Sequence, residues 1–273
     1  MDLKGLDRVL QALGPYLEEL VVCGGWAWYL YRRCLGTPGQ IAAQFTRDVD
    51  CLGLRRLRVL DRPAAARLRD AGFEWIPMGA DRPPAARFAW PDARHPLAEV
   101  EFLTTTRGDG ARRTEELQQG LVAQALPDIE ILTDAPVTLT IDDRSPISQD
   151  VAYRGAIRVP NVGHFAIQKT LIASRRTAEQ RVKDFFYVFD LVDAPSGLAD
   201  RLLEDVIRAS SSRWQRAAGT FMAYMEKSAD QPTLHKGVTE QYPPEIRPAE
   251  NYVREEVRRW NARLRIQLDM IRG

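Results

Sequence analysis

The sequence predicts an α/β protein of the α+β kind, in which a mixed β-sheet flanked by helices is followed by a helical C-terminal domain. Up to about residue 160, short segments that alternate polar and apolar residues lie between segments of helical periodicity. Beyond residue 160 the helical period dominates. We therefore expect an α/β domain at residues 1–160 and a helical C-terminal domain at residues 161–273.

The expected elements of the first domain follow from these patterns and from the glycines and prolines that interrupt them. An amphipathic helix near residues 3–17 precedes a short β-branched strand at 20–23, and Gly24-Gly25 leads from that strand into an aromatic-rich helix that ends near Gly36. The remaining elements are a strand at 46–53, a helix at 63–71, irregular proline-rich chain at 77–96, a strand at 97–103 and weaker strands at 129–132, 137–141 and 156–160.

The second domain is expected to consist of helices. The predicted helices span residues 164–175, 178–192, 198–208, 214–227 and 252–271, with a loop at 231–248.

The composition excludes several classes of protein. The 273 residues include 38 basic and 37 acidic side chains, so the formal net charge is +1 and no overall basic field attracts nucleic acid. The hydrophobic fraction of 45% argues against disorder. The sequence shows no membrane helix, no signal peptide and no CxxC pair, which predicts a cytoplasmic protein with reduced thiols.

Acidic side chains dominate two of the predicted strands. Asp48 and Asp50 alternate along one strand, which places their Cα atoms about 7 Å apart with both side chains on one face. Carboxylates in this arrangement suit one or two magnesium ions that also bind substrate phosphates. Glu101 on the later strand is the candidate third acid, with Glu99 on the same face as its rival. The alternative is that these acids are solvated side chains on an exposed sheet face.

A glycine pair precedes these acidic strands. Gly24 and Gly25 between a strand and a helix let the backbone approach a ligand closely, and N–H groups at a helix start favour phosphate. Any tight strand-to-helix turn could use such a pair, and no Gly-Lys-Ser/Thr of a Walker motif follows. The order Gly-Gly, Asp-x-Asp and acidic strand is more specific than any one of its parts.

That order resembles the nucleotidyltransferase superfamily, which has the polymerase-β-like fold. The matching segments are Val22-Cys23-Gly24-Gly25-Trp26-Ala27, Phe45-Thr46-Arg47-Asp48-Val49-Asp50 and Val100-Glu101-Phe102-Leu103-Thr104. The Thr-x-Asp-x-Asp form is similar to a bacterial branch that contains abortive-infection and toxin–antitoxin nucleotidyltransferases. In that branch a lysine-bearing helix is followed by a Lys-Asp helix, which residues 165–184 match.

The resemblance implies magnesium-dependent, or manganese-dependent, transfer of a nucleoside monophosphate from an NTP to a hydroxyl group. The implied acceptor is RNA or tRNA, a protein or a small molecule, the implied protein partner is an antitoxin, and no membrane contact is expected. The implied metal ligands are Asp48, Asp50 and Glu101, with Glu101 as ligand or base. The implied nucleotide-binding residues are Gly24, Gly25, Thr46, Lys169, Lys183 and Asp184. The alternative for each lysine is a surface position on an amphipathic helix.

Two residues depart from the family pattern. Trp26 stands where relatives usually carry Ser or Thr, and Glu101 replaces the commoner Asp. Because a two-metal site tolerates little displacement of its ligands, these changes leave a second hypothesis open. In that hypothesis the protein kept the fold and binds nucleotide or RNA without turnover. A third hypothesis is a scaffold protein whose acids bind nothing.

Overall fold

The structure is a computed structural model that describes residues 3–36, 46, 48–54, 56–78, 86–91, 98–106, 113–194 and 197–272. The chain divides into two compact units. One consists of Met1–Cys34 and Phe45–Pro160, and the other of Leu35–Gln44 and Asn161–Gly273. Each unit is described by itself below.

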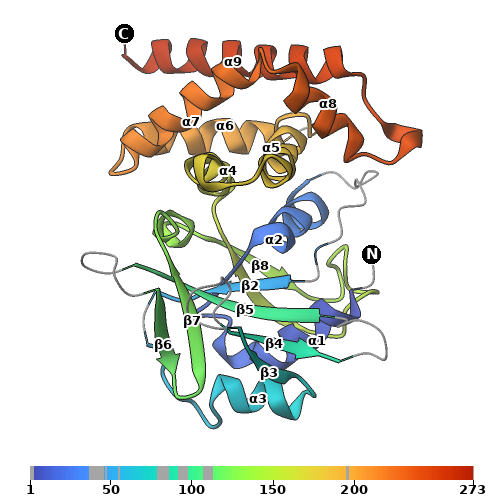
Figure 1. Cartoon of the computed structure of the whole chain (residues 1–273), viewed down its shortest axis with the longest axis vertical. Coiled ribbons are helices and arrows are strands. Elements are labelled where there is room, and N and C mark those ends of the chain that lie inside the picture. Colours follow the sequence, from blue (N-terminus) through green and yellow to red (C-terminus); the bar gives the residue numbers. More distant parts are fainter. Residues whose placement is uncertain are drawn as a thin grey trace. The chain divides into compact units, whose positions relative to one another are not determined.

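A mixed sheet forms the centre of the first unit (Figure 1). Its strands lie in the order β1 (Val21–Cys23), β2 (Asp48–Leu52), β5 (Ala98–Thr105), β4 (Ala86–Trp90) and β3 (Glu74–Pro77). The β2–β5 pair is parallel, whereas β1–β2, β4–β5 and β3–β4 are antiparallel. The buried centre of the sheet is therefore the pair of strands that carries the predicted acids.

A hairpin completes this sheet. Strand β7 (Leu121–Leu126) runs parallel to the end of β5, beyond the stretch that pairs with β4, and β6 (Thr114–Gln118) pairs antiparallel with β7. A separate antiparallel pair consists of β8 (Val137–Ile141) and β9 (Gly155–Val159). A 3₁₀ turn at Glu130–Thr133 lies between β7 and β8 in the sequence.

One face of β2 and β5 is apolar. Val49, Cys51, Val100 and Phe102 are at most 2% exposed, because successive side chains of a strand point to opposite faces. The helices of this unit are α1 (Lys4–Leu13), α2 (Gly24–Leu30) and α3 (Ala64–Asp70), with a 3₁₀ turn at Gly14–Tyr16 and a π-helical turn at Tyr31–Leu35. Helix α1 packs against α3 and β5, and α2 packs against β1 and β2. The acidic side chains consequently occupy the face opposite the apolar one.

The second unit consists of helices. They are α4 (Val162–Leu171), α5 (Ala178–Val192), α6 (Leu198–Ser210), α7 (Gln215–Ser228), α8 (Pro232–Glu240) and α9 (Glu250–Arg272), with 3₁₀ turns at Ala173–Arg175 and Pro244–Ile246. Helix α4 is buried along nearly its whole length and packs against α6 and α7. Helix α5 starts with a reciprocal capping box between Thr177 and Gln180.

The fold class predicted from sequence is confirmed, and several local predictions are wrong. Strand β4 lies inside the segment expected to be irregular, because the surrounding prolines conceal its short alternation. The expected strand at 129–132 is a 3₁₀ turn. Strands β3, β6 and β7 and helix α8 were not expected from the sequence pattern.

Among the helices that the structure describes, none is both long and apolar enough to cross a lipid bilayer.

Candidate active site

The acids of β2 and β5 meet because the two strands pair in parallel and in register. Asp48 lies opposite Glu99, and Asp50 lies opposite Glu101. Directly opposite residues of neighbouring strands present their side chains on the same face. Four carboxyl groups therefore share one face of two adjacent strands.

Three of these carboxyl groups converge. Ligand oxygens of Asp48, Glu99 and Glu101 all lie within 4.8 Å of one another. Asp48 is exposed, Glu101 is partly buried and Glu99 is buried. Carboxylate oxygens at this separation are the hard ligands that Mg²⁺ and Mn²⁺ take in proteins. The donor set thus fits a divalent cation, and Glu99 belongs to it.

The pKa values of Glu99 and Glu101 are both raised in this crowded site. Burial, followed by the charges of Asp50, Asp48 and Glu99, raises the pKa of Glu101 to about 8. Burial also raises the pKa of Glu99; the Arg87 guanidinium opposes this shift, and the charge of Asp48 and a hydrogen bond with its carboxyl group add to it. A divalent cation would relieve the repulsion that adds to the effect of burial on these pKa values.

Arg87 brings a positive charge to this acidic face. It lies on β4 directly opposite Glu101, and its Nη1 is 2.7 Å from Oε2 of Glu99. The sequence analysis missed Arg87, because β4 lies within proline-rich chain. The signal that could have revealed it is the alternation in Ala86-Arg87-Phe88, which places Phe88 in the core and Arg87 on the other face.

The glycine turn packs directly against the second aspartate. Gly24 has φ +64°, and a Cβ atom added there would overlap Oδ2 of Asp50. Antiparallel pairing of β1 with β2 places the preceding residue, Cys23, opposite Asp50. Gly24 is therefore required by backbone conformation and by the position of the Asp50 carboxylate, independently of any ligand.

The other residues predicted beside the nucleotide also have defined surroundings. Gly25 is buried in the first turn of α2. Thr46 is partly buried, and its hydroxyl donates a hydrogen bond of 3.4 Å to the Asp48 carbonyl. Trp26, 3% exposed, packs edge-on against Tyr29, and its indole N–H has no hydrogen-bond partner among the described residues. Trp26 thus fills buried space in the first turn of α2.

The predicted lysines lie in the second unit. Lys169 on α4 is 8% exposed, and its Nζ is 2.9 Å from Oδ1 of Asp184 on α5. The same ammonium lies 5.4 Å from the ring centroids of Phe165 and Tyr187, a cation–π arrangement. Lys183 is partly buried on α5. Asp184 therefore holds Lys169 in place, and the structure groups these predicted residues within their own unit.

Arg176 adds a second cation to that group. Its Nε is 3.2 Å from Oδ2 of Asp184, so the carboxylate lies between a lysine and an arginine. Two cations therefore contact one acid, and Lys183 is the residue before that acid in the sequence. This part of α4–α5 carries a net positive charge.

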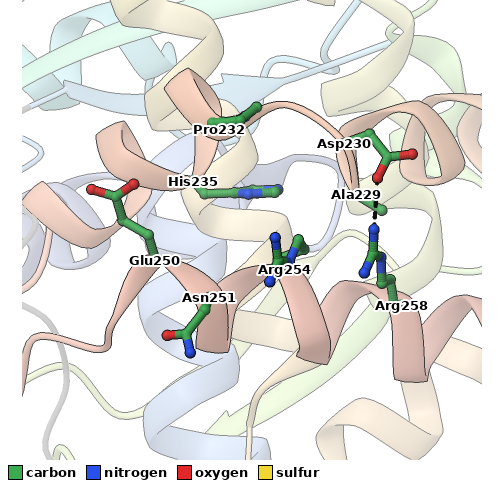
Figure 2. Close-up of a pocket in the computed structure, with 8 residues that line it drawn as sticks. All are labelled: Ala229, Asp230, Pro232, His235, Glu250, Asn251, Arg254 and Arg258. Atoms are coloured by element: carbon green, nitrogen blue, oxygen red, sulfur yellow. Dashed lines mark hydrogen bonds and ion pairs between the residues drawn. The ribbon is translucent and has the colours of Figure 1, made fainter.

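A cavity with a volume of about 370 Å³ lies between α8 and α9 (Figure 2). It is lined by Ala229, Asp230, Pro232, His235, Glu250, Asn251, Arg254 and Arg258. Its two arginines are balanced by two acids, and Arg258 pairs with Asp230 at 2.8 Å. Burial lowers the pKa of His235, which favours the neutral ring. This cavity is electrically balanced and differs in character from the acidic face of the sheet.

A comparison of the chain with protein families gives a match over most of its length. A family model described as "Nucleotidyltransferase" matches residues 4–205. The matched segment contains β1, β2 and β5 with the glycine turn and the acids, and also α4 and α5 with the lysines. A comparison with curated proteins found no match.

Proposed function

Because the chain belongs to the nucleotidyltransferase family, we propose that it transfers a nucleoside monophosphate from an NTP to a hydroxyl group in a Mg²⁺- or Mn²⁺-dependent reaction. The observation that supports this most strongly is the register of β2 with β5, which gathers four carboxyl groups on one sheet face beside the glycine turn. An acidic face of this kind repels a triphosphate unless a cation binds there as well.

Asp48, Asp50 and Glu101 are the residues proposed to hold the cation. A bound divalent ion supplies positive charge for the phosphate oxygens and for the leaving pyrophosphate. Asp48 is the most exposed of the three, while packing against Gly24 fixes Asp50. Glu101 is the ligand or the base that accepts the proton of the incoming hydroxyl.

The nucleotide contacts are proposed from the family resemblance. Gly24 and Gly25 would bind phosphate through the backbone, and Thr46, two residues before Asp48, would also contact the nucleotide. Lys169 and Lys183 would contact the triphosphate, and Asp184 would position Lys169. The supporting observation is that Asp184 already orients the Lys169 ammonium, at 2.9 Å, within a group of net positive charge.

A thermal-shift experiment with matched variants tests the proposal. We expect NTP with Mg²⁺ to raise the melting temperature of the protein more than either does alone, and we expect Asp48→Asn with Asp50→Asn to abolish this effect. The control is Glu74→Gln with Glu204→Gln, which makes the same charge change at two exposed positions on β3 and α6. The control should retain the full shift.

Transfer itself is measured with labelled NTP and separate RNA, tRNA, protein and small-molecule acceptors. Transfer of label to one of these acceptors by the wild type, but not by the Asp48→Asn and Asp50→Asn variant, supports the proposed activity and identifies the acceptor. Nucleotide binding without transfer supports the alternative of a degenerate family member, for which buried Trp26 is the structural argument. No response to NTP or Mg²⁺ contradicts both.

The resemblance to the abortive-infection and toxin–antitoxin branch extends the proposal to a cytoplasmic toxin with an antitoxin partner. Slowed growth on expression of the wild type, absent with the Asp48→Asn and Asp50→Asn variant, is the expected result. Equal growth with both proteins would contradict a toxin role.

A further inference from the structure

The acidic face holds one carboxyl group more than the family pattern uses. Asp48, Asp50 and Glu101 match that pattern, whereas Glu99 is an additional acid on the same face. Glu99 is 8% exposed, so its charge is poorly solvated. A buried carboxylate of this kind needs a compensating partner.

Arg87 supplies that partner by a diagonal contact. Register places Arg87 opposite Glu101, yet its Nη1 bonds Oε2 of Glu99 at 2.7 Å. The residue directly opposite Glu99 is Ala89, whose side chain reaches no acid, and diagonal neighbours on paired strands lie within reach of long side chains. The pairing of Arg87 with Glu99 therefore follows from the strand register.

The contact continues from Glu99 to a proposed metal ligand. Ligand oxygens of Glu99, Asp48 and Glu101 lie within 4.8 Å of one another, so the Glu99 carboxylate borders a proposed metal ligand. Partners that contact ligating carboxylates orient them and adjust the affinity of the site. Arg87 thus acts on Asp48 through Glu99.

We propose that Arg87 is a positioning residue that compensates the charge of Glu99 and thereby sets the position of Asp48 and the net charge of the site that binds a divalent cation. This inference rests on the proposed function. In this assignment the charge of Arg87 cancels that of Glu99. The cation then meets the net charge of three carboxylates.

The affinity of the nucleotide-free protein for Mn²⁺, measured by isothermal titration calorimetry, tests this assignment without any activity assay. In Arg87→Gln the Glu99 charge is uncompensated and attracts the cation, so affinity should rise about tenfold. In Glu99→Gln the guanidinium is unpaired and repels the cation, so affinity should fall about tenfold. The double variant has the wild-type net charge and should bind within about threefold of the wild type.

A conservative variant and a structural readout complete the design. Arg87→Lys keeps the positive charge and should bind Mn²⁺ nearly as the wild type does. A purely structural role of Arg87 would lower affinity in every variant, because a distorted site binds any cation less well. Opposite signs for Arg87→Gln and Glu99→Gln, with recovery in the double variant, support the assignment.

Three results would overturn it: weaker Mn²⁺ binding by Arg87→Gln, tighter or unchanged binding by Glu99→Gln, or no recovery in the double variant. If Arg87→Gln does not fold, Glu99→Gln and Arg87→Lys still decide the matter. A wild type that binds no Mn²⁺ contradicts the proposed function as well. This inference alone fails if the wild type binds Mn²⁺, the Asp48→Asn and Asp50→Asn variant does not, and Arg87→Gln and Glu99→Gln have no opposite effects on the affinity.

Discussion

Gly24 forms the turn between β1 and α2 and packs against Asp50, a proposed metal ligand. Its φ of +64° is uncommon for residues with a side chain, and a Cβ atom there would overlap the Asp50 carboxylate. Both constraints act in the absence of any nucleotide. Gly24 therefore matters for stability and for the geometry of Asp50 at once.

Gly24→Ala should lower the free energy of unfolding by about 1–3 kcal/mol through backbone strain, with a further loss from displacement of Asp50. It should also weaken Mn²⁺ binding. Gly219→Ala in α7 is the matched control, because nothing lies within 4 Å of an added Cβ there. The control should stabilise the protein by up to about 1 kcal/mol. Urea unfolding measures both, and equal effects of the two substitutions would contradict the packing argument.

The pKa of Glu101 predicts how the metal-free protein responds to pH. The folded-state pKa of about 8 is above the ordinary value of 4.5, so the folded protein favours the protonated carboxyl group. The stability that this group contributes is complete below pH 4.5 and is lost as pH rises through 8. Raising the pH within this window should therefore destabilise the metal-free wild type.

Glu101→Gln removes the titrating group and its repulsion. In the presence of a chelator, the variant should melt at a higher temperature than the wild type at pH 8, and at nearly the same temperature at pH 4.5. Mg²⁺ should stabilise the wild type at pH 8 and should not stabilise the variant. If the melting temperatures of the two proteins change in parallel between pH 4.5 and pH 8.5, this explanation is wrong.

The candidate acids could be selected from sequence because a strand repeats every two residues, which puts Asp48 with Asp50 and Glu99 with Glu101 on one face. The choice between Glu99 and Glu101 as third acid depends on strand register and on a long-range contact. Register pairs Asp50 with Glu101, and Arg87 binds Glu99. Neither relation is encoded in local periodicity.

At the scale of elements, the α4–α5 pair depends on a buried ionic contact. Lys169 and Asp184 are 8% and 7% exposed, and Arg176 also contacts Asp184. Removing one member of a buried pair leaves an uncompensated charge. The contact thus ties the stability of these helices to residues proposed to serve the nucleotide.

Asp184→Asn should lower the free energy of unfolding by about 3 kcal/mol, because the Lys169 ammonium loses its carboxylate in a buried site. Glu179→Gln, at an exposed position in the first turn of α5, should cost less than about 1 kcal/mol. Chemical denaturation of both variants gives the comparison. A cost for Asp184→Asn no larger than that of Glu179→Gln would show that the pair adds nothing to stability.

Elements with strong periodicity were predicted, and elements defined by tertiary contacts were not. Helix α5 occupies residues 178–192 as predicted, because its apolar positions and its capping box agree. Helix α8 was expected to be a loop, since it is short, begins with Pro232 and contains Gly237. In the structure a Cβ at Gly237 would press on Val182 of α5, so this glycine permits close helix packing.

At the scale of the whole molecule, the described chain keeps its two charged groups in separate compact units. The carboxylates belong to the first unit, and Lys169, Asp184 and Arg176 belong to the second. A cation held by the carboxylates should therefore stabilise the first unit directly. The triphosphate contacts proposed for the second unit are those of Lys169 and Lys183.

Hydrogen–deuterium exchange can separate these contributions. Mn²⁺ alone should slow exchange in β2 and β5 and leave α6 and α7 unchanged. A non-hydrolysable NTP analogue added with Mn²⁺ should also slow exchange in α4 and α5, if Lys169 and Lys183 contact phosphate as proposed. Protection in α4 and α5 by Mn²⁺ without nucleotide would contradict the assignment of the cation to the first unit.

The fold class follows from the change of hydrophobic period along the chain, whereas the sheet order does not. The order β1-β2-β5-β4-β3 brings β5 beside β2, although the two strands are far apart in sequence. Short alternating segments do not encode which strand becomes a neighbour. The β6–β7 hairpin escaped prediction because its turn, Gln119-Gly120, is not one of the strong turn pairs.

The parallel, in-register pairing of β2 with β5 also bears on how the chain folds. Forming this pair brings Asp48 against Glu99 and Asp50 against Glu101, so the step that builds the sheet centre works against like-charge repulsion. The pair is also non-local, and its closure is intrinsically slow. Divalent cations in the refolding medium would screen this encounter, so the ion proposed for the reaction would also speed the assembly of the sheet.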